Sequence, residues 1–203
     1  DAKYAELVET CLYNSILSGI SLDGKKYFYT NPLRISADLP YTLRWPKERT
    51  EYISCFCCPP NTLRTLCQAQ NYAYTLGSEG IYCNLYGANT LTTNWKDKGE
   101  IALTQKTAYP WEGNVRVEFD RVPRKAGAFS LFLRIPEWCE KAMLTVNGEL
   151  VPVAAKANTY AEVKRTWKKG DVVEWVMDMP VRLLEAHPLA EEIRNQVVVK
   201  RGP

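Results

Sequence analysis

Hydrophobic positions recur at helical spacing in two places within the first eighty residues. Near the N-terminus, apolar or small side chains lie three or four positions apart over 4–15, and Gly19 follows as a stop signal. A second such pattern runs over 60–76, starts at a Pro-Pro pair and stops at Gly77. We therefore expect two helices in this part of the chain.

The segment between these patterns, 19–58, has no helical periodicity. It is rich in aromatic, proline and turn residues. An irregular segment of this length is uncommon inside a compact domain and is often functional where it occurs. We expect binding or catalytic residues here.

From Gly80 onward the pattern changes to an alternation of polar and apolar residues, which is typical of half-buried strands. Eight segments read as strands: 81–87, 99–108, 114–122, 128–136, 142–150, 159–167, 171–179 and 195–201. Gly, Pro, Asn and Asp separate them at intervals of about ten residues, the spacing of a β-sandwich. Asn147-Gly148 is a hairpin turn signal.

These patterns predict a mixed fold in two parts. Residues 1–78 hold the last helices of a larger helical domain, and 79–203 form an all-β antiparallel sandwich that is truncated at its end. The chain opens inside a helical pattern without an initiator Met and closes in or just after a strand. We expect it to derive from a longer protein, here termed the parent.

The composition excludes several classes of partner. Of the 203 residues, 46% are hydrophobic and 24% charged, which is ordinary for a globular protein. The net charge of +3 is too small to indicate nucleic acid or an anionic membrane as a partner. No apolar run approaches the ~20 residues of a membrane span.

Seven cysteines are the most unusual feature of the composition: Cys11, Cys55, Cys57, Cys58, Cys67, Cys83 and Cys139. The odd count and the crowding at 55–58 make a poor disulfide framework and favour reduced thiols or metal ligands. Cys11, Cys67, Cys83 and Cys139 fall on apolar faces of their patterns, where free cysteine behaves as a small hydrophobe. We expect these four to pack in a core.

The cluster at 55–58 has three interpretations. Cys57 and Cys58, held at a turn, could provide half of a tetrahedral zinc site, with Cys55, Glu48, Glu51 or His187 as possible completions. They also precede the second expected helix, whose N-terminal partial charge favours a nucleophilic thiolate. A redox thiol site is the third interpretation, and it needs a resolving partner.

The stretch "CCPPN" at 57–61 resembles the signature of the β-L-arabinofuranosidase-type glycoside hydrolases, family 127 and its relatives, long grouped as DUF1680. Other stretches resemble the family in the same order. They are "LYNSILSGISLDGKKYFYTNPL" at 12–33, "LRIPEWC" at 133–139, "VNG" at 146–148, "RTWKKGDVVEW" at 165–175 and "VVVKRGP" at 197–203. The resemblance covers nearly the whole chain.

This resemblance implies an (α/α)6 barrel followed by β-sandwich domains, and hydrolysis of β-L-arabinofuranosides with retention of configuration. It implies a zinc ion held by cysteines and a glutamate, with a cysteine as the nucleophile. Cys57 matches the nucleophile and one zinc ligand, and Cys58 matches a second zinc ligand. Tyr29 lies in a matching stretch and is the candidate for a sugar contact. The partners implied are an arabinose-containing glycan and the rest of the parent's barrel.

Part of the family's machinery lies upstream of this chain. The acid/base glutamate and the Glu-x-Cys pair that completes the zinc site precede the signature, and only 56 residues stand before Cys57. We find neither element among them and do not assign Glu9-Thr10-Cys11 to this role. We therefore expect the chain alone to be inactive and to bind zinc weakly.

Several alternatives remain open from the sequence. The chain could be a non-catalytic carbohydrate-binding or interdomain β-sandwich with a helical arm. Tyr27, Phe28 and Trp45 could join Tyr29 in a sugar platform or could pack in a core. His187 reads as structural or exposed. Reduced cysteines fit a bacterial cytoplasm, but metal-held thiols also fit a periplasm, so the compartment is left open.

Overall fold

The computed structural model describes residues 1–31, 34–35, 42 and 44–203. Segments 12–33 and 19–58, which the sequence singles out, therefore lie partly outside the described residues. The described chain forms two compact units that alternate along the sequence. One unit comprises Asp1–Leu7, Asn71–Val181 and Arg201–Pro203, and the other comprises Val8–Gln70 and Arg182–Lys200. The expected division of the chain after residue 78 stays a prediction.

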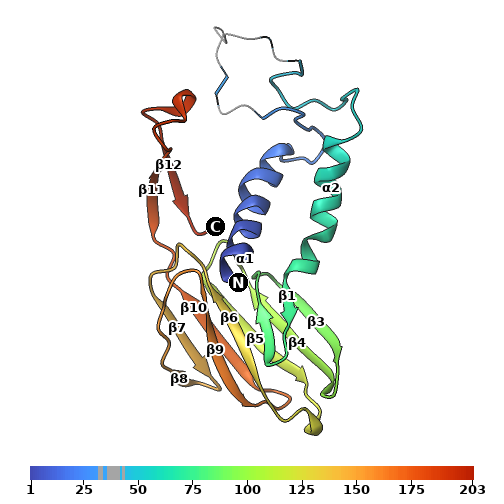
Figure 1. The fold of residues 1–203 in the computed structure, drawn as a ribbon, viewed down its shortest axis with the longest axis vertical. Helices are drawn as coiled ribbons and strands as arrows, with labels where there is room; N and C mark the ends of the chain where they lie inside the picture. Colours follow the sequence, from blue (N-terminus) through green and yellow to red (C-terminus); the bar gives the residue numbers. More distant parts are fainter. Residues whose placement is uncertain (32–33, 36–41, 43) are drawn as a thin grey trace. The chain divides into compact units, whose positions relative to one another are not determined.

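The first unit is a β-sandwich, as the alternating pattern predicts. One sheet has four strands in the order β1-β2-β6-β9, and the other has six in the order β3-β4-β5-β10-β7-β8 (Figure 1). The strands are β1 (Tyr74–Leu76), β2 (Gly80–Cys83), β3 (Asn89–Trp95), β4 (Gly99–Thr107), β5 (Asn114–Arg121), β6 (Ala128–Ile135), β7 (Ala142–Val146), β8 (Glu149–Val151), β9 (Thr159–Thr166) and β10 (Val172–Met177). A short 3-10 helix, η4 (Arg124–Ala126), precedes β6.

The strand bounds and their backbone pairing confirm most of the expected strands and the hairpin. Asn147 and Gly148 adopt positive φ values of 53° and 84° and connect β7 to β8. One pairing departs from the expected antiparallel arrangement, because β2 runs parallel to β6. Gly80 permits this approach, since a Cβ there would lie 2.0 Å from the carbonyl oxygen of Ser130.

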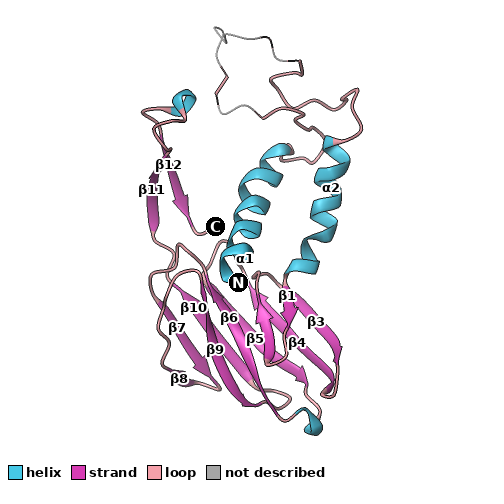
Figure 2. Ribbon diagram, viewed as in Figure 1, coloured by secondary structure: helices cyan, strands magenta, loops and turns pink. Residues whose placement is uncertain are grey.

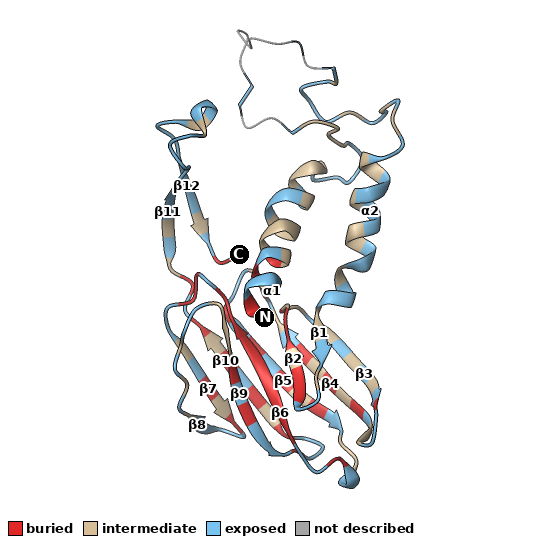
Figure 3. Ribbon diagram, viewed as in Figure 1, coloured by how far each residue is buried: buried red, intermediate tan, exposed pale blue. Residues whose placement is uncertain are grey.

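Aromatic side chains from both sheets form the core of the sandwich. Phe129 on β6 contacts Trp95 on β3 and Phe119 on β5, with ring centroids 5.4 and 6.1 Å apart. Trp167 stacks on Phe119 at 4.4 Å. Figure 3 shows that buried residues are concentrated in central strands such as β2 and β6. Apolar burial on this scale is the dominant favourable contribution to folding.

The opposite face of β6 carries a buried ion pair. The Arg134 guanidinium is fully buried and donates to Glu6 Oε2 at 2.5 Å and to the carbonyl oxygen of Asn84 at 2.5 Å. Glu6 Oε2 also accepts from the backbone N–H of Glu137 at 3.1 Å. The first turns of the N-terminal helix thereby belong to the sandwich unit.

The helices follow the expected positions with one correction. The N-terminal helix α1 (Ala2–Thr10) continues as a π-turn, η1 (Cys11–Ile16), and a 3-10 turn, η2 (Leu17–Gly19), so it stops at the predicted glycine (Figure 2). Helix α2 (Cys58–Gln68) gives way to a 3-10 turn, η3 (Ala69–Tyr72).

The expected helix over 60–76 was wrong in its last turn, because Tyr74–Leu76 form strand β1. Backbone pairing with β2 and a hydrogen bond from the Tyr74 hydroxyl to Asn89 Oδ1 at 2.6 Å outweigh the weak helical preference there.

Between α1 and α2 the described residues form loops tied by a few backbone bonds. Tyr27 forms isolated bridges with both Ile20 and Thr50, and the Arg49 guanidinium donates to the Ser18 carbonyl at 2.6 Å. Near the other end of the chain, β11 (Val181–Glu185) pairs with β12 (Val197–Arg201) around a 3-10 turn, η5 (Glu191–Ile193). None of the helices in the described ranges is both long and apolar enough to cross a membrane.

Candidate functional site

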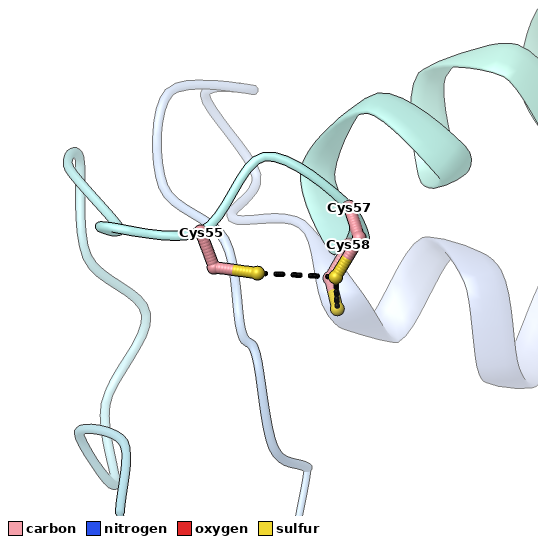
Figure 4. A group of neighbouring side chains, drawn as sticks. All are labelled: Cys55, Cys57 and Cys58. Atoms are coloured by element: carbon pink, nitrogen blue, oxygen red, sulfur yellow. Dashed lines mark hydrogen bonds between the residues drawn. The ribbon is translucent and has the colours of Figure 1, made fainter.

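Three cysteine sulfurs meet just before helix α2. The Sγ atom of Cys57 lies 3.1 Å from that of Cys55 and 3.3 Å from that of Cys58, so Cys57 is the middle member (Figure 4). Cys57 is exposed, and Cys55 and Cys58 are half-buried. Among the described residues this is the one group of three or more Cys, His, Asp or Glu side chains close enough to share a metal ion. We call it the sulfur cluster.

The start of α2 explains how the cluster is held. Cys57 occupies the N-cap position and Cys58 is the first helical residue. The backbone N–H of Asn61 donates to the Cys57 carbonyl at 3.0 Å, and Thr62 Oγ1 donates to the Cys58 carbonyl at 3.1 Å. The two prolines that follow need no N–H partner in the first turn. The Cys57 thiol makes no capping bond, so it is available for chemistry.

The donor set fits zinc. Thiolates are preferred zinc ligands, and all three sulfurs lie within 4.8 Å of one another. Two thiolates on one tetrahedral zinc ion lie roughly 3.8 Å apart, given a Zn–S distance of about 2.3 Å. The observed separations are somewhat shorter, so a small opening of the cluster would admit the ion. Three sulfurs still leave one tetrahedral position for another ligand.

Tyr29 lies within electrostatic reach of the cluster. Negative charge on the sulfurs of Cys57 first, then Cys55 and Cys58, raises the pKa of the Tyr29 phenol above its ordinary value. The phenol therefore stays protonated and keeps its O–H as a donor. Its ring packs against that of Trp45 with centroids 4.2 Å apart and planes at 34°. A phenol and an indole that pack together offer the kind of aromatic face on which a sugar ring can stack.

The other two aromatic candidates have local partners. The Tyr27 hydroxyl donates to the Gly24 carbonyl at 3.1 Å, and the Phe28 ring lies 4.5 Å from the Arg49 guanidinium carbon. These contacts support the loop, and of the four aromatic candidates Tyr29 is the one linked electrostatically to the sulfurs.

The possible completions from other parts of the sequence do not join the sulfurs in the described chain. Glu48, Glu51 and His187 are absent from the group that could share a metal ion, and so are Glu9 and Cys11. His187 is exposed, and its Nδ1 accepts from the backbone N–H of Leu189 at 3.2 Å. The sequence named Cys55 only as one option among several.

The remaining cysteines divide between core and surface. Cys83 and Cys139 are buried in the sandwich, which confirms their expected packing. Cys11 is half-buried. Cys67 is exposed on α2, so the expectation that it packs in a core was wrong for this chain, where α2 has no buried residue.

Comparisons with known families identify the two parts of the chain. The model of the β-L-arabinofuranosidase GH127 catalytic domain matches residues 1–71, and that of the GH127 middle domain matches residues 80–179. The sulfur cluster falls within the catalytic-domain match, and most of the sandwich falls within the other.

Individual relatives give the same result. The chain is 31% identical to the non-reducing end β-L-arabinofuranosidase of Bifidobacterium longum subsp. longum, a match that covers 99% of the chain and 31% of the relative. A solved glycoside hydrolase is 89% identical with a TM-score of 0.92, and the match covers 100% of the chain and 33% of that structure. A GH127 β-L-arabinofuranosidase from Geobacillus stearothermophilus T6 is 37% identical with a TM-score of 0.83, covering 100% of the chain and 32% of that structure. The chain thus spans about a third of the length of these relatives.

Proposed function

Because the chain belongs to glycoside hydrolase family 127, we propose that it carries the nucleophile of a retaining glycosidase that removes terminal L-arabinofuranose or a related sugar. The observation that carries the proposal is the sulfur cluster, with the exposed Cys57 thiol at its centre and the Tyr29 phenol beside it. The named relatives are β-L-arabinofuranosidases, and the cluster offers chemistry that fits that reaction.

Cys57 takes the place of the second carboxylate found in most retaining glycosidases. Its thiolate attacks the anomeric carbon of the terminal sugar, and the glycosidic C–O bond breaks as a C–S bond forms. The leaving oxygen takes a proton from a carboxylic acid that the parent's remaining barrel supplies. The carboxylate that gave up its proton then takes one from a water molecule, which attacks the same carbon and breaks the C–S bond, so that the sugar is freed and the thiolate and the acid are restored.

Cys57 and Cys58 are the proposed zinc ligands, with Cys55 as the third available sulfur. A bound zinc ion would keep coordinated thiols deprotonated at neutral pH. Tyr29 donates its O–H to a sugar hydroxyl and orients the ring over the nucleophile. Trp45 packs against Tyr29 and limits its movement.

The test compares variants of the full-length parent with an aryl arabinofuranoside as substrate. Replacing Cys57 with Ser should lower the hydrolysis rate by on the order of 10⁴-fold or more, because a catalytic nucleophile is lost. Cys67→Ser is the matched control, since it removes a thiol of α2 that lies outside the sulfur cluster, and should retain the wild-type rate.

The chain of 203 residues alone should show no turnover. Wild-type rates in the parent carrying Cys57→Ser would sink the proposed mechanism. A parent without glycosidase activity that still retains arabinose-containing glycans would favour the carbohydrate-binding alternative.

A further inference from the structure

We propose that the sulfur cluster is also a reversible oxidation site, in which Cys55 is the resolving thiol that closes a disulfide with Cys57 after attack by a hydroperoxide. The inference rests on the proposed function in one respect only: oxidation would regulate hydrolysis because Cys57 is the proposed nucleophile. Its geometric basis is independent of the substrate.

The first support is the position of Cys55. Its Sγ lies 3.1 Å from Cys57 Sγ, and a disulfide of about 2.05 Å requires these sulfurs to approach by only about 1 Å. In the part of the chain that the structure describes, the hydrogen-bond partner recorded for the Cys55 thiol is Cys57 alone. Cys55 lies in irregular backbone before α2, so the approach needs no helix to unwind.

The second support is the exclusion of Cys58 as the resolving thiol, although its sulfur is almost as close. Consecutive Cα atoms lie about 3.8 Å apart across a trans peptide, below the roughly 4.4–6.8 Å that a disulfide spans. A Cys57–Cys58 disulfide would therefore strain the peptide between them. Cys58 is also fixed in the first turn of α2, where its carbonyl accepts from Thr62 Oγ1. Two residues of separation remove this constraint for Cys55.

The third support is exposure. Cys57 is the exposed member of the cluster, so an oxidant reaches it first. Cys55 is half-buried, and its sulfur lies 3.1 Å from that of Cys57, close enough to meet the oxidised sulfur. An accessible thiol with a second thiol close by is the usual arrangement of a redox-sensitive cysteine.

The chemistry balances with hydrogen peroxide as the oxidant. The Cys57 sulfur attacks the peroxide, the O–O bond breaks, and a sulfenic acid and one water form. The Cys55 thiol then attacks that sulfur, the S–O bond breaks, and a second water leaves as the S–S bond forms. Two thiols lose two electrons in total, and a dithiol such as dithiothreitol returns them by thiol–disulfide exchange.

The disulfide would have two consequences. It removes the proposed nucleophile, so hydrolysis stops. It also removes one sulfur donor from the zinc set, so metal affinity falls. Because the disulfide is reducible, the site is protected from the irreversible sulfinic and sulfonic acids that a lone exposed thiol reaches.

The experiment uses the reduced full-length parent, treated with a chelator and then with hydrogen peroxide, and alkylated with iodoacetamide. Trypsin releases residues 50–64 as one peptide that holds Cys55, Cys57 and Cys58. We expect this peptide to carry a single alkyl group, on Cys58, and to lack two hydrogens relative to the reduced form. Dithiothreitol should restore three alkylation sites, and dithiothreitol followed by zinc should restore the hydrolytic activity.

The variants separate a resolving role from a structural one. In the parent carrying Cys55→Ser, Cys57 should accumulate as sulfinic acid, and dithiothreitol followed by zinc should restore little activity. Cys67→Ser should behave as the wild type does. Zinc content and the activity of each reduced variant supply the baseline for these comparisons.

Three results would overturn the inference: a Cys57–Cys58 disulfide with Cys55 alkylated, full alkylation of the peptide after excess peroxide, or equal recovery of Cys55→Ser and the wild type. The peptide measurement uses no sugar. A parent that forms the Cys55–Cys57 disulfide but hydrolyses no arabinofuranoside would therefore contradict the proposed function and leave this inference standing.

Discussion

The cysteines of the sandwich and those before α2 are the same residue type in opposite environments. Cys83 is fully buried on β2, and burial raises the pKa of its thiol to about 12. Burial likewise raises the pKa of the Cys139 thiol to about 11, and its Sγ donates to the Lys141 carbonyl at 3.3 Å. The sulfur cluster is exposed or half-buried at a helix N-terminus. Burial makes a thiol inert and a small hydrophobe, whereas exposure among other sulfurs permits chemistry.

The same contrast extends to the two units that hold these cysteines. The sandwich has its own core, with seven of the eight residues of β6 buried. Helix α2 has no buried residue, and Leu63 on it is 48% exposed. The sandwich therefore supplies its own stability. Helix α2, which starts at the sulfur cluster, has no such core of its own within the described residues.

The largest effect on stability is expected when the buried ion pair of the sandwich is removed. Arg134→Met leaves the Glu6 carboxylate buried without its cation, and should lower the free energy of unfolding of the chain by about 3–5 kcal/mol. Urea unfolding followed by tryptophan fluorescence measures the change. The sulfur cluster should keep its reactivity toward iodoacetamide in this variant under native conditions.

A surface ion pair provides the matched control. Arg116 and Glu174 are 3.3 Å apart with side chains 43% and 52% exposed, and Arg116→Met should cost less than about 1 kcal/mol. If both variants lost the same stability, the buried pair would not be the support that the structure indicates.

A smaller effect is expected in the pH dependence of the free energy of unfolding, and it tests the difference between buried and exposed cysteines. The pKa of the Cys83 thiol is higher in the folded chain than in the unfolded one, so above pH ~9 the unfolded state binds fewer protons. The neutral thiol makes its full contribution to the free energy of unfolding below that pH. This contribution is lost as the pH rises toward 12. Between pH 8 and 10 the loss should be on the order of 1 kcal/mol.

Cys83→Ala isolates this contribution from other alkaline titrations. Urea unfolding at pH 8 and pH 10 should show a smaller loss of stability in Cys83→Ala than in the wild type, while Cys67→Ser should match the wild type. An identical pH dependence in all three proteins would show that the Cys83 thiol does not stay neutral in the fold.

Much of the sandwich could be predicted from period-two alternation, because one face of each strand enters the core. Two of its strands could not. β1 has three residues and follows a helical pattern, so Tyr74 reads as a continuation of that helix. β3 carries few apolar residues in "NTLTTNW", and its single buried position is Trp95 at the end. Both are edge strands, where pairing with a neighbour decides the conformation.

The candidate site could be predicted in its centre but not in its full extent. "CCPPN" drew attention to Cys57 and Cys58, and the resemblance supplied the chemistry. Cys55 had a signal of its own, since residues two apart in extended chain point to the same side. The association of Tyr29 with Trp45, sixteen positions away, depends on loop contacts such as that between Arg49 and Ser18, which no local pattern encodes.

The most direct test of the central claim is to identify the residue that reacts at the anomeric carbon. The full-length parent would be incubated with an arabinofuranose mimic that bears a cysteine-reactive group at that carbon, and the adduct located by peptide mass spectrometry. We predict a single adduct on Cys57 that excess L-arabinose prevents. An adduct on Cys55 or Cys67 that L-arabinose does not prevent, or no adduct at all, would contradict the assignment of Cys57 as the nucleophile.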